Sequence, residues 1–211
     1  MTFSGNVESW RLVASILEHV VTKLDIARVS LCEAQQQALA PTSFDSSRVP
    51  EITIHDYIAR IHQFAECSES CYTIAFIYID RALMMNPGLK LSMKSVHRLL
   101  ITCVVLAIKY CDDIYAKNVI YSKIGGLPLQ ELNYLEDEML NLLRYNLYVD
   151  PLQYLQYTNE LERRTQQIMT RVTPHEEIEI NNQGKCNYQA DITQSTGSIQ
   201  IFPLTEDMME A

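Results

Sequence analysis

The stretch HRLLITCVVLAIKYCDD, residues 97–113, constrains the fold more than any other part of the chain. Placed on a helix at about 100° per residue, residues 96–110 put apolar side chains or alanine on most sides. One narrow stripe differs, and it consists of Arg98, Thr102, Val105 and Lys109. A helix that is apolar almost all round is typically central to its domain. The stretch therefore predicts a central helix, with Lys109 where the polar stripe reaches the surface.

The sequence around this stretch predicts more helices with short connections between them. Turn-forming groups such as Asn86–Pro87–Gly88 and Gly125–Gly126–Leu127–Pro128 separate segments with helical periodicity. We expect five helices, at about 52–65, 69–86, 93–111, 116–123 and 129–146. Five helices joined in this way form a compact all-α domain.

The segments before and after this domain also show helical and polar patterns. Apolar residues recur at three and four residue steps over about residues 8–29, which predicts one more amphipathic helix. The polar stretch that follows predicts a linker, and LQYLQYTNELERRTQQI predicts a short helix after the domain. The expected organisation is an N-terminal helix in 1–31, a linker in 32–50, the main domain in 51–149, a C-terminal helix in 150–169 and a flexible acidic tail in 170–211.

Charge excludes several classes of partner. The chain has 211 residues, 47% of them apolar, and a formal net charge of −9. A general electrostatic attraction to nucleic acid or to an anionic membrane is therefore absent, and we expect neither partner. Charged side chains interrupt the first apolar stretch, which excludes a signal peptide or a membrane span there.

The cysteines indicate reduced thiols rather than disulfides or a metal site. The chain has no CxxC pair, and its six cysteines are Cys32, Cys67, Cys71, Cys103, Cys111 and Cys186. Several stand inside apolar helical patterns, as expected for buried thiols of an intracellular protein. His62 lies near two of them, but no fourth ligand is evident, so we expect no metal and no cofactor.

Three charged residues stand in apolar surroundings. Glu136 lies near the middle of a helical face formed by Leu129, Leu132, Leu135, Met139, Leu140, Leu143 and Leu147. An unpaired buried carboxylate costs several kcal/mol, so Glu136 needs a partner. Two interpretations stay open for Glu136 and Lys109: a pair inside the fold, or charges reserved for another protein. Asp80, in YIDR, is interpreted as a structural carboxylate.

The order of these motifs resembles a cyclin box. The chain has YIDR, then an apolar helix that ends in AIKYCDD, then LEDEML ahead of LLRYNL. More narrowly, FDSSRVPEITIHDYIARI and SVHRLLITCVVLAIKYCDDIYAKNVIYSKIGGLPLQ resemble the P-type and U-type cyclins, a subfamily that includes phosphate-pathway regulators. The resemblance covers about residues 44–157.

The resemblance implies a kinase regulator with a single cyclin box and no catalytic residues of its own. In cyclins, a lysine that ends the third box helix and a glutamate early in the fifth hold the regulatory helix of a cyclin-dependent kinase. These match Lys109 and Glu136, and neighbouring family contacts fall on Tyr110, Leu140 and Tyr145. The implied partner is the catalytic subunit of such a kinase, with no small-molecule substrate.

The chain also departs from the family pattern. In mitotic and S-phase cyclins the first box helix opens with a substrate-docking patch whose arginine braces the aspartate of the YIDR-like motif. An ungapped count back from Asp80 places Pro50, Glu51, Ile52, Thr53 and Ile54 there. The patch and its arginine are thus missing, and Arg48 or Arg60 is expected to brace Asp80 instead.

Two other classes of function agree less well with the sequence. One is a cyclin-box scaffold of the transcription-factor kind, which binds DNA and polymerase; the acidic chain with one box argues against it. The other is an enzyme, for which no nucleophile with its base and no paired carboxylates in a cleft are evident. The histidines are scattered, at His19, His55, His62, His97 and His175.

Overall fold

The computed structural model describes residues 8–29 and 41–171 of the chain. These residues form helices and no strand, which confirms the predicted all-α class. The helices are α1 (Ser9–Val29), α3 (Ile54–Ala65), α4 (Ser70–Met85), α5 (Val96–Cys111), α6 (Asn118–Gly125), α7 (Leu129–Leu142) and α8 (Pro151–Arg171). Part of the predicted linker, 30–40, and nearly all of the predicted tail, from 172 on, lie outside the described residues.

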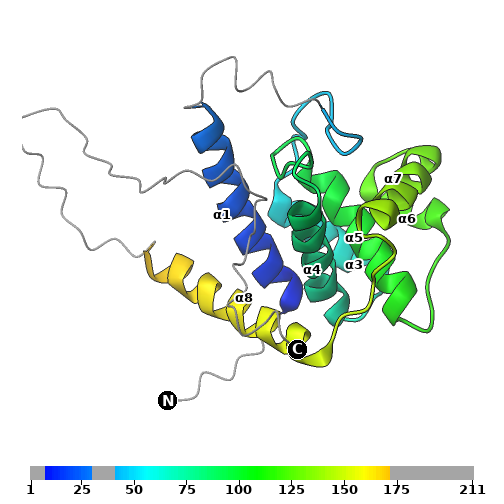
Figure 1. Ribbon diagram of the computed structural model, residues 1–211. Coiled ribbons are helices and arrows are strands. Elements are labelled where there is room, and N and C mark those ends of the chain that lie inside the picture. The colour runs from blue at the N-terminus through cyan, green and yellow to red at the C-terminus, as the bar shows by residue number, and fades with distance from the viewer. Residues whose placement is uncertain (1–7, 30–40, 172–211) are drawn as a thin grey trace, which may run out of the picture.

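Helices α4 and α5 form the centre of the molecule (Figure 1). They pack against each other, α1 and α8 cover α4 on one side, and α7 and α6 pack on α5 on the other. Nearly every side chain of α5 is buried, including the whole run Leu99–Ile108. The central position predicted for this helix is therefore observed, since a helix that is apolar all round must be covered on all sides.

Local signals in the sequence account for several helix ends. The Thr53 side chain caps α3 by accepting a hydrogen bond of 3.0 Å from the backbone N–H of Asp56. Asp150 accepts a hydrogen bond of 2.8 Å from the N–H of Leu152, directly after Pro151 opens α8. Gly126 ends α6 in the left-handed region, with φ of 68°.

Two helices are shorter than predicted by three or more residues. Helix α5 begins at Val96 instead of 93, because Ser92–Ser95 forms a turn in which the Ser92 N–H donates to Ser95 Oγ at 3.0 Å. Helix α7 ends at Leu142 instead of 146, because Arg144 and Tyr145 take φ of 52° and 57°. Left-handed residues cannot continue a right-handed helix.

The flanking segments are more closely tied to the domain than the sequence suggested. Phe44, in the described part of the predicted linker, is fully buried. The C-terminal helix expected in 150–169 is α8, which has 21 residues, as α1 does. Helices α1 and α8 pack against each other and against α4.

Candidate functional site

Lys109 and Glu136 form an ion pair between α5 and α7. Lys109 stands in the last turn of α5, and its Nζ lies 2.5 Å from Glu136 Oε1. The two side chains are 28% and 14% exposed, so the pair is partly desolvated but open to solvent on one side. The two side chains that the sequence singled out thus lie together at the surface end of the polar stripe on α5.

Asn118 completes the arrangement around Glu136. Its Nδ2 donates to Glu136 Oε2 at 2.6 Å and to Asn133 Oδ1 at 2.7 Å. Both oxygens of the carboxylate therefore accept a hydrogen bond, one from α5 and one from α6. Such bonds fix the rotamer of the carboxylate and hence the position of the lysine that it binds.

Sequence reasoning missed Asn118, although a signal for it existed. Helices α6 and α7 are joined by only three residues, 126–128, and pack against each other. In a helical hairpin, residues that are equally far from the turn face each other. Asn118 and Glu136 are each nine positions from Leu127.

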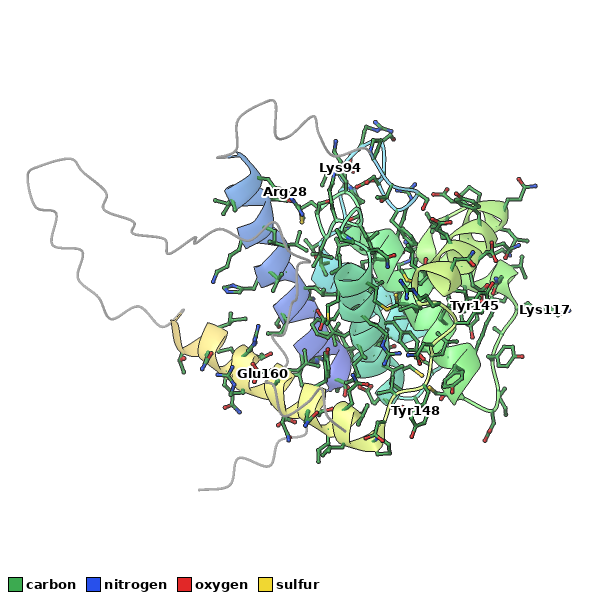
Figure 2. All side chains as sticks on the ribbon, viewed as in Figure 1. Arg28, Lys94, Lys117, Tyr145, Tyr148 and Glu160 are labelled. Atoms are coloured by element: carbon green, nitrogen blue, oxygen red, sulfur yellow. The ribbon has the colours of Figure 1, made fainter. Side chains whose placement is uncertain are left out.

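The other predicted site residues lie around this pair. Tyr110 follows Lys109 directly and is 51% exposed. Leu140 is one helical turn beyond Glu136 and is half-buried, and its carbonyl accepts a hydrogen bond of 2.8 Å from the N–H of Tyr145. Tyr145 is 64% exposed, and Figure 2 shows it on the α6 and α7 side of the molecule.

Helix α4 holds the segment that carries Tyr145. The hydroxyl of Tyr78 donates to the carbonyl of Leu147 at 2.7 Å, and Arg81 Nη1 donates to the carbonyl of Asn146 at 2.5 Å. Burial, above all, raises the pKa of Tyr78, so its hydroxyl stays a donor. The backbone after α7 is thus fixed from within, while Tyr145 and Tyr148 project outward. Sequence reasoning did not assign this role to Arg81.

Exposed apolar side chains extend this surface beyond α5. They lie in the connection from α5 to α6 and in the first turn of α6, and they are Ile114, Tyr115, Val119 and Ile120. Ile114 is 86% exposed. The connection is held by Tyr121, whose hydroxyl accepts a hydrogen bond of 3.0 Å from the N–H of Ala116. Clustered exposed apolar residues of this kind mark interaction sites.

Asp80 lies apart from this surface. It is fully buried in α4, and its Oδ2 accepts a hydrogen bond of 2.7 Å from the hydroxyl of Tyr157 in α8. Of the two arginines expected to brace it, Arg60 donates to the carbonyl of Lys123 at 2.8 Å. Tyr157 is 77 positions away from Asp80 in the sequence, so local patterns do not reveal this hydrogen bond.

No group of three or more His, Cys, Asp or Glu side chains among the described residues is placed to hold a metal ion. None of the helices in the described ranges combines the length and the apolar character needed to cross a membrane.

Comparison with known proteins decides the family. A family model described as Cyclin matches residues 10–147, from the first turn of α1 to just after α7. The chain belongs to the cyclin family. This cyclin is 38% identical over 151 residues to Cyclin-P4-1 of Oryza sativa subsp. japonica, which covers 72% of the chain and 71% of the rice protein.

Two further relatives point to the same subfamilies of cyclins. Cyclin-U4-1 of Arabidopsis thaliana is 36% identical over 151 residues, covering 72% of the chain and 73% of the relative. Cyclin-P3-1 of Oryza sativa subsp. japonica is 36% identical over 154 residues, covering 73% and 63%. The resemblance to P-type and U-type cyclins that the motifs indicated is therefore confirmed.

Proposed function

We propose that this cyclin is the regulatory subunit of a cyclin-dependent Ser/Thr protein kinase and binds the regulatory helix of that kinase. The proposed contact is the pair face, which we define as Lys109, Tyr110, Glu136, Leu140 and Tyr145. The observation that carries the proposal is the partly exposed Lys109–Glu136 pair beside exposed tyrosines. The cyclin names of its relatives agree with it.

The hydrogen-bonding capacity of the pair supports a role toward a partner. A lysine ammonium has three N–H donors, and Glu136 takes one of those of Lys109. The others can meet the backbone carbonyls that a partner helix leaves unsatisfied at its C-terminus. Exposed tyrosines supply the apolar contact area, and tyrosine is enriched where binding energy concentrates in protein interfaces.

Activation would follow from selective binding. A cyclin that binds the active arrangement of the kinase more tightly than the inactive one shifts the population toward the active state. In protein kinases that state requires the regulatory helix to bring its glutamate to the lysine that holds the ATP phosphates. The pair face then acts as a clamp that fixes the register and angle of that helix.

Titration of purified cyclin-dependent kinases with this cyclin tests the proposal. Lys109→Ala and Glu136→Ala should each weaken binding by about 2–5 kcal/mol, because the remaining charge of the pair is left desolvated in the complex. Each variant should reach the wild-type kinase activity only at a correspondingly higher concentration of cyclin.

The matched control is Arg98→Ala. Arg98 also forms an ion pair between α5 and α7, with Glu131 at 2.6 Å, but it lies at the other end of the polar stripe. Its loss should affect folding stability about as much as the loss of Lys109, and kinase affinity much less. If folded Lys109→Ala and Glu136→Ala proteins activated the kinase at the wild-type concentration, the pair face would be wrongly assigned.

A further inference from the structure

A groove between α1 and α8 lies away from the pair face. It has a volume of about 320 Å³ and is lined by Ile16, His19, Val20, Lys23, Arg163, Arg164, Gln167 and Ile168. Helices α1 and α8 stand on the side of the molecule opposite α6 and α7 (Figure 1). Glu160, at the edge of this region, is labelled on α8 in Figure 2.

The groove is positively charged in an acidic protein. Its apolar part is Ile16, Val20 and Ile168, which pack on the core, and the other lining residues are basic or amide side chains. None of the eight lining residues is acidic. The local sign of charge is thus the reverse of the net charge of −9.

Two of the cations that line the groove share one carboxylate beside it. Glu160 accepts hydrogen bonds from both Arg163 and Arg164, at 2.6 Å each. The bond from Arg163 is the main cause that lowers the pKa of Glu160 to about 2, so Glu160 stays charged at ordinary pH. Lys23 adds a third permanent cation to the lining of the groove, in which no residue is acidic.

The size of the groove selects the kind of ligand. Pockets for small molecules usually have volumes of about 300–1,000 Å³, and this one is at the small end. It has room for a few side chains rather than for a whole cofactor. Apolar walls with a cationic rim suit a short peptide that carries both apolar and acidic side chains.

We propose that the groove binds the cyclin's own C-terminal segment, residues 199–210. This segment reads IQIFPLTEDMME, in which four apolar residues precede the acidic residues Glu206, Asp207 and Glu210. It contains no Lys or Arg. Its pattern therefore matches the two chemistries of the groove, and it belongs to the part of the chain outside the described residues.

The connection to α8 is long enough for this contact. The 27 residues 172–198 separate the end of α8 at Arg171 from the segment, and a flexible chain of that length has a root-mean-square span of about 30 Å. Arg163 is only about 12 Å from Arg171 along the helix, at 1.5 Å per residue. The tether supplies an effective concentration of about 1 mM, so even an intrinsic Kd of about 0.1 mM would keep the segment bound most of the time.

Hydrogen–deuterium exchange on the full-length protein tests the proposal. With an effective concentration of about 1 mM and a Kd of about 0.1 mM, amides in 199–210 should exchange about tenfold more slowly than in an unbound chain. Lys23→Glu with Arg163→Glu should remove the slowing, and so should Glu206→Lys, Asp207→Lys and Glu210→Lys, which leave α1 and α8 unchanged. A protein that carries both the groove substitutions and the segment substitutions should again show slow exchange in 199–210, because the two opposite charges have then changed places.

Two matched controls carry the same charge changes elsewhere. Lys94→Glu with Lys117→Glu alters two exposed lysines away from the groove (Figure 2). Glu176→Lys, Glu177→Lys and Glu179→Lys alter three acidic residues between α8 and the segment. Neither control should change exchange in 199–210. Loss of slowing with either control would show a general charge effect and would overturn the proposal.

Two other results would also overturn it. One is wild-type exchange in 199–210 at the rate of an unbound chain. The other is a contact between two molecules. A photo-cross-linking residue placed at Phe202 tests for it in a mixture of isotopically light and heavy protein, where such a contact gives products that join a light chain to a heavy one. Binding within one chain predicts cross-links to α1 or α8 of the same molecule at every protein concentration.

Discussion

Tyr157 and Asp80 connect α8 to the central helix α4 through one buried hydrogen bond of 2.7 Å. Burial raises the pKa of Tyr157, and the negative charge of Asp80 adds to this effect, so the phenol stays protonated and donates. A charge-assisted bond between buried groups contributes more than an exposed one. The bond therefore adds a buried polar link to the apolar packing of α8 on the core.

We predict that Tyr157→Phe destabilises the protein by about 1–3 kcal/mol, because the buried carboxylate of Asp80 loses a hydrogen-bond donor. Urea unfolding followed by circular dichroism measures the change. Tyr154→Phe, three residues away on the same helix, removes a hydroxyl from a half-buried tyrosine and should change the free energy of unfolding by less than about 0.5 kcal/mol. If the two variants lost the same free energy of unfolding, the hydrogen bond to Asp80 would not stabilise the protein more than an ordinary hydroxyl does.

His97 predicts a pH dependence of stability. It is buried at the start of α5, and its Nε2 lies 3.0 Å from the carbonyl of Ile52. Burial lowers the pKa of His97 below its usual 6.5. The unfolded chain therefore takes up a proton before the folded protein does. The resulting stability is fully present above pH 6.5 and is lost as the pH falls through the lowered pKa.

His97→Gln isolates this contribution, because a glutamine amide can still donate to Ile52 but does not titrate. We expect the wild type to lose stability relative to this variant as the pH falls below 6.5, by at most about 1.4 kcal/mol per pH unit. Thermal unfolding at several pH values measures the difference. A constant difference between the two proteins across this range would contradict a buried neutral His97.

The sequence alone predicted the interactions of some residues but not of others. A glutamate in the middle of an apolar face needs a partner, so a charge close to Glu136 could be expected, and Lys109 lies there. The use of this pair by a kinase stays a prediction. The hydrogen bond from Tyr157 to Asp80 could not be foreseen, because Tyr157 comes from a helix whose docking depends on the whole fold.

At the scale of helices, the apolar periodicity predicted which segments are helical, and the ends depended on local geometry. The start of α3, which follows its N-capping residue Thr53, was within two positions of the prediction. The early end of α7 was not foreseen, because neither Arg144 nor Tyr145 is a residue that usually takes a positive φ. The contacts of α4 with the following segment hold that backbone in place.

The turn between α6 and α7 contains two glycines with different roles. A Cβ on Gly125 would lie 2.9 Å from Ile101 Cγ1, so Gly125→Ala should cost about 1–3 kcal/mol through overpacking. A Cβ on Gly126 would meet only Arg60 Nη1, at 4.0 Å, but φ is 68°, so Gly126→Ala should cost about 1–2 kcal/mol through backbone strain.

Gly88 is the matched control for both glycines, because nothing lies within 4 Å of a Cβ built there. Gly88→Ala should leave the free energy of unfolding unchanged or slightly raised. Chemical unfolding of the three variants gives the comparison. A loss at Gly125 no larger than that at Gly88 would mean that α6 can move away from α5 without cost.

At the scale of the molecule, α1 belongs to the same core as the five helices of the box. Seven of its residues are buried in that core, and they are Trp10, Leu12, Val13, Ala14, Ile16, Leu17 and Val21. Trp10 stacks on His62 of α3 with ring centroids 5.1 Å apart, and the N–H of Ser9 donates to Glu69 at 3.0 Å. These contacts predict that α1 unfolds together with the box.

The single tryptophan of the chain makes this cooperativity measurable. Trp10 fluorescence reports the docking of α1, circular dichroism reports all helices, and the two unfolding curves should coincide in one transition. Leu17→Ala should shift both curves together by about 2–5 kcal/mol, and Ile77→Val in α4 should shift both by about 0.5–1.5 kcal/mol. If α1 were only an added helix, Leu17→Ala would move the fluorescence curve alone. In that case the buried face of α1 would be a docked surface rather than part of one cooperative core.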